Sequence, residues 1–340
     1  MKEDHPLLQV EHIKKYYPVR GGIISHTIAQ VKAVEDMTFE IKKGTTLGLV
    51  GESGCGKSTM GKLIAGLEKP DEGRILFDGV DLTDLSEKER KPYRLRMQMI
   101  FQDSFSSLNP RKRVEDILLE PMLFHKIASK ENADVQVLRL LDMVGLSSDS
   151  LGRFPYEFSG GQRQRICIAR ALSLNPDFIV CDEPVSALDV SIQAQILNLL
   201  LDLQKQLGLT LLFIGHGLGA VNYISDRIAV MYLGRLVEIA DASELFRHPA
   251  HPYTQALCDA APNPDPCIRD RKKTEILQGE AEIHQQPKEE ESIGCLFAPR
   301  CPYRRESCLS ICPELLPVPG TEPGSHLSAC PYVFGQKGEH

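Results

Sequence analysis

The sequence is organised around two stretches, Phe158-Ser159-Gly160-Gly161-Gln162 and Phe178-Ile179-Val180-Cys181-Asp182-Glu183. The second is an apolar run that ends in two acids, as expected of a buried strand that presents carboxylates at its C-terminal end. After a phosphate-binding loop, such a pair is suited to holding Mg²⁺ and activating a water molecule. The Ser-Gly-Gly run lets backbone N–H groups and a hydroxyl approach a phosphate. Residues 163–172 read as a helix, so these amides would lie at a helix N-terminus, which favours anions.

A phosphate-binding loop lies nearer the start of the chain. Residues 46–50 read as a short apolar strand, and Gly51-Glu52-Ser53-Gly54-Cys55-Gly56-Lys57-Ser58-Thr59 follows at once. This loop satisfies G-x-x-x-x-G-K-[ST] between a strand and a helix. Its backbone amides would face the phosphates, Lys57 would supply a positive charge, and Ser58 would bind Mg²⁺. The motif alone predicts a site for a nucleoside triphosphate.

The composition predicts a soluble protein of more than one domain. At 340 residues the chain is long enough for about two domains and an appendage. Its 42% hydrophobic and 25% charged residues are typical of globular proteins, and its net charge of −7 argues against nucleic acid as the main partner. The most apolar stretch, residues 196–214, is interrupted by polar residues, and residues 2–6 contain no apolar region. We therefore expect no transmembrane span, no secretory signal and a cytoplasmic chain.

The rest of the chain alternates strands and helices. Between residues 67 and 91 we expect polar turns and short strands, and residues 113–145 show helical periodicity. Gln102 follows an apolar strand and opens the loop 104–110, and His216 ends a late apolar strand. Further strands are expected at 8–17, 34–41, 74–77, 97–101 and 211–216 and as a hairpin within 227–237.

Half of the ten cysteines gather near the end of the chain, at positions 295, 301, 308, 312 and 330. In a cytosolic chain we expect them to be reduced, metal-bound or buried rather than paired in disulfides. The spacing C-x₅-C-x₆-C is not that of zinc-finger knuckles. Four thiolates that converge from loops suit a tetrahedral site or an iron–sulfur cluster. The residues alone leave iron–sulfur, zinc and unmetallated thiols open.

The glycine run placed before the acid pair, together with the phosphate loop, resembles an ATP-binding-cassette (ABC) ATPase. The resemblance implies an α/β, P-loop nucleotide-binding domain of the ABC type, with an antiparallel β subdomain and a helical insertion. This domain would span residues 1–262, with the helical subdomain at about 104–172. A small Cys-rich C-terminal extension would follow over residues 263–340.

The resemblance also implies a role for each motif residue within one chain. Gln102 would ligate Mg²⁺ and couple the γ-phosphate to the loop after it. Asp182 would hold Mg²⁺ with Ser58, and Glu183 would orient and activate the attacking water. His216 would contact the γ-phosphate, although Gly215 and Gly217 stand where the family usually has Ser and Asp.

Other motif residues would serve the base of the nucleotide or a second chain. Tyr17, with Tyr16 as the alternative, would stack on adenine. Ser159-Gly160-Gly161-Gln162 would bind the γ-phosphate held by the other subunit. Phe158 replaces the commoner leucine of this signature. Asp189 would belong to the dimer-contact loop 186–189.

Several shorter motifs are similar to those of the oligopeptide/dipeptide importer branch. They are His-Pro-Tyr-Thr at 251–254, Glu-Ser-Gly-Cys at 52–55 and Ser-Leu-Asn-Pro at 107–110. The Tyr-Pro start and Cys55 resemble the second of the two ATPases that such importers carry. The tail is similar to segments that bind a [4Fe–4S] cluster, which matches Cys295, Cys301, Cys308 and Cys330 and leaves Cys312 as an extra. Residues 288–291 replace a proline-rich turn and read as a solvated linker.

The branch implies an ATPase that powers import of di- or oligopeptides at the cytoplasmic face of the cell membrane. Its partners would be a paralogous ABC ATPase, two transmembrane permease subunits and an extracytoplasmic substrate-binding protein. Related ATPases serve nickel or glutathione importers, so these cargoes stay open. A soluble, non-transport ABC ATPase usually carries two cassettes or a long coiled coil, which this chain lacks. A non-hydrolysing regulatory subunit would be expected to lack Glu183 or His216.

Overall fold

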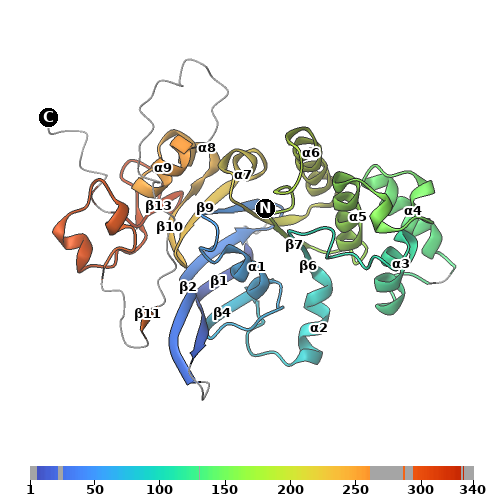
Figure 1. Ribbon diagram of the computed structural model, residues 1–340, viewed down its shortest axis with the longest axis horizontal. Coiled ribbons are helices and arrows are strands. Elements are labelled where there is room, and N and C mark those ends of the chain that lie inside the picture. Colours follow the sequence, from blue (N-terminus) through green and yellow to red (C-terminus); the bar gives the residue numbers. More distant parts are fainter. Residues whose placement is uncertain are drawn as a thin grey trace.

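The computed structural model describes residues 6–21, 26–129, 131–260, 286–287, 294–330 and 332 (Figure 1). The strands are β1 (Pro6–Gly21), β2 (His26–Lys42), β3 (Thr46–Val50), β4 (Glu72–Phe77), β5 (Val80–Asp81), β6 (Met97–Ile100), β7 (Phe178–Asp182), β8 (Thr210–Gly215), β9 (Arg227–Tyr232), β10 (Arg235–Asp241), β11 (Gln286–Pro287), β12 (Leu316–Pro317) and β13 (His326–Ser328). The α-helices are α1 (Lys57–Ile64), α2 (Glu87–Arg96), α3 (Val114–Phe124), α4 (Ala133–Met143), α5 (Gly160–Leu172), α6 (Val190–Leu207), α7 (Leu218–Ile224), α8 (Ala242–Arg247) and α9 (Pro252–Ala260). Within these residues, no helix combines the length and the apolar character needed to cross a bilayer.

The main sheet has the strand order β12-β13-β10-β9-β3-β8-β7-β6. The strands from β9 to β6 pair in parallel, and every residue of β3, β7 and β8 is buried. Parallel strands covered on both faces need continuous apolar sequence, which explains the three runs in the chain. Because these strands are parallel, the residues that follow β3, β7 and β8 emerge at one edge of the sheet.

Both faces of the main sheet are covered, so that its side chains alternate between two cores. Val180 and Ile214 pack with Met60 of α1 and with the strands of the second sheet. On the opposite face, Ile179 and Phe213 pack with α5 and α6 (Figure 1). The α/β fold class predicted from the sequence is therefore confirmed.

The second sheet has the order β11-β2-β1-β4-β5 and is antiparallel throughout. Its long strands β1 and β2 extend beyond the expected segments 8–17 and 34–41. Shifts of register interrupt their pairing, and His12 and Asp36 have positive φ angles of 51° and 56° near two of them. Such bulges bend a long hairpin so that it can wrap the phosphate-loop end of the molecule. This sheet is the expected antiparallel β subdomain.

The helical insertion contains α3, α4 and α5, which pack on one another. The expected helical segment 113–145 is divided between α3 and α4. The expectation of turns and strands up to residue 91 was wrong at its end, because α2 begins at Glu87. Ser86 caps this helix, and the Glu89 carboxylate accepts a hydrogen bond from the Ser86 backbone N–H over 3.0 Å. This Ser-x-x-Glu capping box was the available sequence signal.

The described part of the chain after residue 293 lies against the main sheet. β13 pairs with β10 in antiparallel register, and β12 pairs with β13. The pairing is reinforced by a buried contact in which His326 Nε2 lies 2.7 Å from Glu238 Oε1. These described residues of the tail thus continue the main sheet. The predicted linker at 288–291 lies outside the described residues.

Candidate functional site

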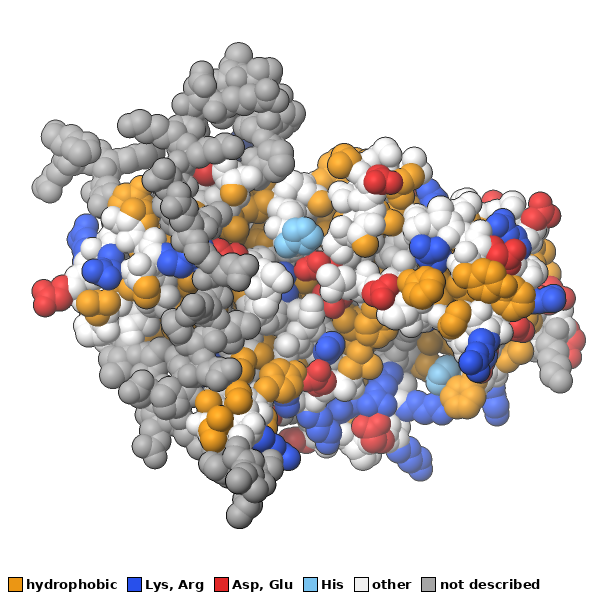
Figure 2. Space-filling view, viewed as in Figure 1, with side chains coloured by type: hydrophobic (Ala, Val, Ile, Leu, Met, Phe, Trp, Pro, Cys, Tyr) orange, Lys and Arg blue, Asp and Glu red, His pale blue; other side chains and the backbone are white. Residues whose placement is uncertain are grey.

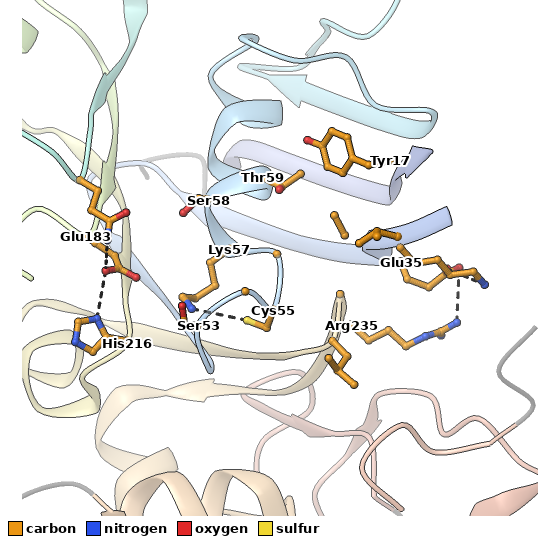
Figure 3. Close-up of a pocket in the computed structure, with 18 of the residues that line it drawn as sticks. Tyr17, Glu35, Ser53, Cys55, Lys57, Ser58, Thr59, Glu183, His216 and Arg235 are labelled. Atoms are coloured by element: carbon orange, nitrogen blue, oxygen red, sulfur yellow. Dashed lines mark hydrogen bonds and ion pairs between the residues drawn. The ribbon is translucent and has the colours of Figure 1, made fainter. Parts of the chain in front are cut away.

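A cleft of about 700 Å³ lies where β3, β7 and β8 end (Figure 3). The predicted site residues that line it are Tyr17, Ser53, Gly54, Cys55, Gly56, Lys57, Ser58, Thr59, Gln102, Glu183 and His216. The fold therefore gathers residues from the phosphate loop, from β1 and from the ends of three parallel strands. This edge of a parallel sheet is where α/β proteins bind their ligands.

The phosphate loop closes on itself around Lys57. The Lys57 ammonium donates to the carbonyl oxygens of Gly51 and Glu52 over 2.8 Å each, and the residue is 4% exposed. Gly56 has a φ angle of 109°, and a Cβ atom there would come within 1.9 Å of the Ala33 carbonyl oxygen. Only glycine is compatible with both the φ angle and this close approach. The cation is thus held at the start of α1, within the loop, by contacts that a triphosphate could replace.

Ser58 and Asp182 provide neighbouring oxygen atoms. Ser58 Oγ donates to Asp182 Oδ1 over 2.9 Å, which joins the first turn of α1 to the end of β7. Burial raises the pKa of Asp182, and the hydrogen bond from Ser58 acts in the opposite direction. A hydroxyl and a carboxylate side by side are ligands of the kind that Mg²⁺ prefers. The residues present fit the predicted Mg²⁺ ion.

Gln102, Glu183 and His216 meet at a single carboxylate oxygen. Gln102 Nε2 donates to Glu183 Oε2 over 3.0 Å, and His216 Nδ1 lies 3.3 Å from the same oxygen. The Glu183 side chain is 13% exposed and the His216 side chain 59%. Figure 3 shows the contact between them as a dashed line. Glu183 also has a φ angle of 46°, in the left-handed region. Strained backbone of this kind is typical of functional sites.

The two glycines beside His216 have separate structural explanations. A Cβ atom on Gly215 would lie 2.8 Å from Val221 Cγ2, so its absence allows α7 to pack on β8. Gly217 is the N-cap of α7, with a φ angle of −92° that any residue can adopt. Neither glycine has a backbone conformation that depends on glycine. His216 contacts Glu183 even though both of its neighbours are glycines.

Tyr17 and Tyr16 point to different places. Tyr17 lines the cleft, and its hydroxyl donates to Glu68. Burial, followed by this hydrogen bond, raises the pKa of Tyr17 to about 12. The Tyr16 hydroxyl instead donates to Glu35 over 3.0 Å, and Tyr16 is not among the residues that line the cleft. Because only Tyr17 lines the cleft, we favour Tyr17 over Tyr16 as the candidate for stacking on adenine.

The glycine signature Ser159–Gln162 does not line this cleft. Ser159 caps α5, receiving a hydrogen bond from the Gln162 backbone N–H, and both residues are exposed. Figure 1 shows α5 well separated from α1. A Cβ atom on Gly161 would come within 2.5 Å of Ile192, so this glycine is needed for packing against α6 as well. Asp189, also exposed, is the N-cap of α6.

Several residues at the cleft were missed by the sequence analysis. Lys32, Glu35 and Arg235 line it beside Tyr17, with Glu35 between the two cations at 3.3 and 3.7 Å. No motif marks these positions. Leu296, from the C-terminal extension, also lines the cleft. Its presence there depends on how the extension folds back, which local sequence does not reveal.

Two of the tail cysteines, Cys308 and Cys330, contribute to the pKa values of two others, Cys295 and Cys301. The pKa of Cys295 is raised to about 11, mainly by burial, and Cys308 and Cys330 contribute in the same direction. Burial likewise raises the pKa of Cys301, with smaller contributions from Cys330 and Cys308. In the part of the chain that the structure describes, no group of three or more His, Cys, Asp or Glu side chains is arranged to hold a metal ion. The four thiols suit a cluster in their chemistry, but they do not form a closed coordination site.

Known proteins resemble the chain over almost its full length. The ABC transporter family matches residues 34–186, and the oligopeptide/dipeptide transporter C-terminal region matches residues 237–308. The oligopeptide transport ATP-binding protein AppF of Bacillus subtilis is 47% identical over 95% of this chain and 96% of its own length. The putative oligopeptide transport ATP-binding protein YkfD of the same organism is 49% identical over 95% of both chains.

Solved structures give the same result. The dimeric ATP-binding cassette MJ0796, in a post-hydrolysis state bound to ADP and phosphate, is 28% identical with a TM-score of 0.62. The match covers 69% of this chain and 98% of that one. The resemblance noted in the sequence is confirmed: the chain belongs to the ABC transporter family and carries the C-terminal region of its oligopeptide/dipeptide transporters.

Proposed function

We propose that the chain is the ATP-hydrolysing subunit of an importer for di- or oligopeptides. One observation carries the mechanism: the cleft brings together Lys57, Ser58, Gln102, Glu183 and His216, whereas the signature Ser159–Gln162 lies elsewhere on the same chain. A chain built in this way holds half of each of two sites. Two cassettes arranged head to tail would complete both.

Within one cleft, the side chains have separate tasks. Lys57 exchanges its carbonyl partners for phosphate oxygens, and Tyr17 stacks on the base. Glu183 accepts hydrogen bonds through Oε2 and would orient the attacking water, taking up its proton. His216 and Gln102, which both reach this oxygen, would fix the carboxylate and contact the γ-phosphate. Catalysis is then mainly positional and electrostatic.

Ser58, Asp182 and Gln102 would hold Mg²⁺. When bound, this ion would neutralise charge that develops on the phosphate oxygens. Gln102 contacts Glu183 in the present structure, so its amide would have to turn toward Ser58 and Asp182.

The opposing signature would come from a paralogous ABC ATPase. Ser159 and Gln162 are exposed at the N-terminus of α5, where backbone N–H groups attract anions. Asp189, in the loop before α6, would meet its counterpart between the two nucleotides. Because the γ-phosphate would bridge both chains, its hydrolysis would reopen the pair, as in other order-and-release switches.

The partners in the membrane would be two permease subunits, supplied with cargo by an extracytoplasmic substrate-binding protein. The helical subdomain, at about residues 104–172, exposes large hydrophobic side chains, namely Phe105, Phe124, Val135 and Tyr156. Figure 2 shows hydrophobic side chains gathered over this end of the molecule. A permease contact here would place the chain at the cytoplasmic face of the membrane and transmit motion of the loop after Gln102.

Peptide cargo is supported by the names of AppF and YkfD, which are oligopeptide transport proteins. The match to the oligopeptide/dipeptide C-terminal region supports the same class. Nickel or glutathione would be the alternative cargo. Uptake assays on a strain that lacks the chain would distinguish them, because only the cargo of this importer would cease to enter.

Glu183→Gln tests the hydrolytic mechanism. The substitution keeps the size of the side chain but removes the proton acceptor, so turnover should fall by about 10²–10⁴ while ATP binding persists. The closed dimer should accumulate in ATP and be visible by size-exclusion chromatography. Glu314→Gln, at an exposed tail position, is the matched control. Normal hydrolysis by Glu183→Gln would rule out the proposed base.

Dilution tests the shared site. ATP turnover per chain should fall on dilution and should be lost in Ser159→Arg, whose bulk would block the opposing γ-phosphate. A monomeric preparation that hydrolyses ATP at full rate, with or without Ser159, would contradict the two-chain mechanism.

We further propose that the extension, residues 263–340, holds a [4Fe–4S] cluster through Cys295, Cys301, Cys308 and Cys330. Protein purified without oxygen should be brown and contain iron and acid-labile sulfide, both lost in Cys301→Ser. Cys312→Ser is the control and should retain them. Zinc without sulfide would indicate the alternative metal, and colourless, metal-free protein would exclude both.

A further inference from the structure

Glu52, in the phosphate loop, is held from three directions. Its backbone N–H donates to the Tyr253 hydroxyl over 2.8 Å, and its carbonyl oxygen accepts from Lys57. Its carboxylate receives two hydrogen bonds from Arg300, from Nη1 over 2.9 Å and from Nη2 over 3.0 Å. Arg300 is 248 residues away in sequence and belongs to the C-terminal extension. A forked pair of this kind fixes direction as well as distance.

The position of Arg300 is itself well supported. The residue ends a short 3₁₀ helix (Ala298–Arg300) that follows Phe297, which is 1% exposed. The Phe297 ring packs against Tyr232 and Tyr253, with centroids 5.3 and 5.5 Å apart. The side chains of Arg300 and Glu52 are only 15% and 23% exposed, respectively. The same turn therefore presents the guanidinium to the loop and packs behind Tyr253, the other support of Glu52.

The charge of Glu52 gives this contact a consequence for nucleotide binding. A carboxylate within a loop that receives a triphosphate would repel the ligand if it were unpaired. The pairing with Arg300 neutralises the charge of the Glu52 carboxylate. Its two hydrogen bonds also restrict the rotation of that carboxylate. Removing the guanidinium would leave a partly buried, uncompensated negative charge, which is more harmful than losing both partners.

We propose that Arg300 is a positioning residue for the ATP site: through Glu52, it sets the conformation and the charge of the phosphate loop. The C-terminal extension would thereby form part of the ATP-binding apparatus. This inference rests on the proposed ATPase function and assigns the extension a role that does not depend on any metal.

The test uses the full-length chain in its complex with its partners, and compares Arg300→Ala, Arg300→Lys and Arg300→Ala/Glu52→Gln. The KM for ATP should rise about tenfold in Arg300→Ala, with a smaller change in kcat, because a charged hydrogen-bonded pair that holds the phosphate loop is broken. Arg300→Lys keeps the positive charge but not the pair of hydrogen bonds, so its KM for ATP should lie between those of the wild type and Arg300→Ala. The double variant should return to within about threefold of the wild type, because the unpaired charge is gone. Equilibrium binding of a fluorescent ATP analogue gives a second readout.

Arg304→Ala is the control, since Arg304 is an exposed arginine of the same extension. Its KM should equal that of the wild type. A KM for Arg300→Ala within twofold of the wild type, or a double variant no better than Arg300→Ala, would overturn the inference. If Arg300→Ala fails to fold, Arg300→Gln against Arg300→Gln/Glu52→Gln makes the same comparison, because glutamine also removes the positive charge. A wild-type complex that binds no ATP would overturn the proposed function itself.

Discussion

Protonation of His251 should destabilise the region behind the phosphate loop. The ring is 2% exposed, and its Nδ1 accepts a hydrogen bond from the Tyr253 backbone N–H over 3.1 Å. Nδ1 must therefore be unprotonated for the contact to exist. Burial lowers the pKa of His251 from 6.5 to about 4, although the nearby Glu238 acts in the opposite direction. Tyr253 in turn supports Glu52, so this residue links pH to the nucleotide site.

The sign and size of the effect follow from the two pKa values. Because the folded pKa is below the unfolded one, the unfolded chain binds more protons once the pH falls below about 6.5. The contribution of His251 to the free energy of unfolding is therefore constant above about pH 6.5. It declines as the pH falls from about 6.5 to about 4. Each pH unit in this window corresponds to about 1.4 kcal/mol, so a shift from about pH 8 to about pH 5 should cost about 2 kcal/mol.

His251→Asn isolates this contribution. The asparagine oxygen can still accept from Tyr253 N–H, but the side chain does not titrate. Urea unfolding at about pH 8 and about pH 5 should show a loss on acidification that is smaller by about 2 kcal/mol in the variant than in the wild type. His326 and Glu238, which pair nearby, are present in both proteins and cancel in the comparison.

His248→Asn is the matched control, because His248 is 65% exposed and contacts only Glu244 among the contacts described. It should leave the pH dependence of the wild type unchanged. Equal losses on acidification for wild type and His251→Asn would refute the reasoning.

Three further substitutions test other contacts. Lys57→Ala should weaken ATP binding by at least about tenfold, measured by equilibrium titration, since a charged contact to the phosphates is lost; retained affinity would show that the loop is misassigned. Phe297→Ala should lower the free energy of unfolding by about 3–5 kcal/mol and expose the extension to protease, because a buried ring is removed; unchanged proteolysis would contradict its packing role. Gly161→Val should destabilise the chain by about 1–3 kcal/mol through its clash with Ile192, and Ile192→Ala should relieve the loss. Absence of that relief would show that the glycine is needed for another reason.

The elements that the sequence predicts well are those fixed by neighbouring residues. The strand before the phosphate loop and the strand that delivers Asp182 have the predicted bounds to within a residue. Both strands are continuous apolar runs that end at a glycine or an acidic residue. Neighbouring residues alone therefore indicate that the strand is buried and where it ends. By contrast, α6 was not predicted, because its residues were considered only as part of the apolar stretch 196–214, in which a strand was expected from residue 211.

The sequence predicts candidate residues for the site, but it does not predict the contacts between them. Local pattern marks Lys57 and Ser58 as phosphate and metal ligands. That Gln102 and His216 reach one oxygen of Glu183 depends on the order of strands in the sheet, which no local pattern fixes. Their roles remain predictions from the family resemblance, and the structure adds that the three side chains lie in contact.

The contact between Glu52 and Arg300 defines the limit of such predictions most clearly. Each residue, taken alone, reads as an ordinary charged side chain in a loop, and exposed ion pairs contribute little to stability. This pair differs because its side chains are only 15% and 23% exposed, with Arg300 lying over the rings of Tyr232 and Phe297, and because one partner belongs to the phosphate loop. Those conditions arise only when β13 joins β10 and brings the extension back to the sheet. A family whose members vary in this extension should therefore vary in how firmly the loop is held, even where the loop sequence is the same.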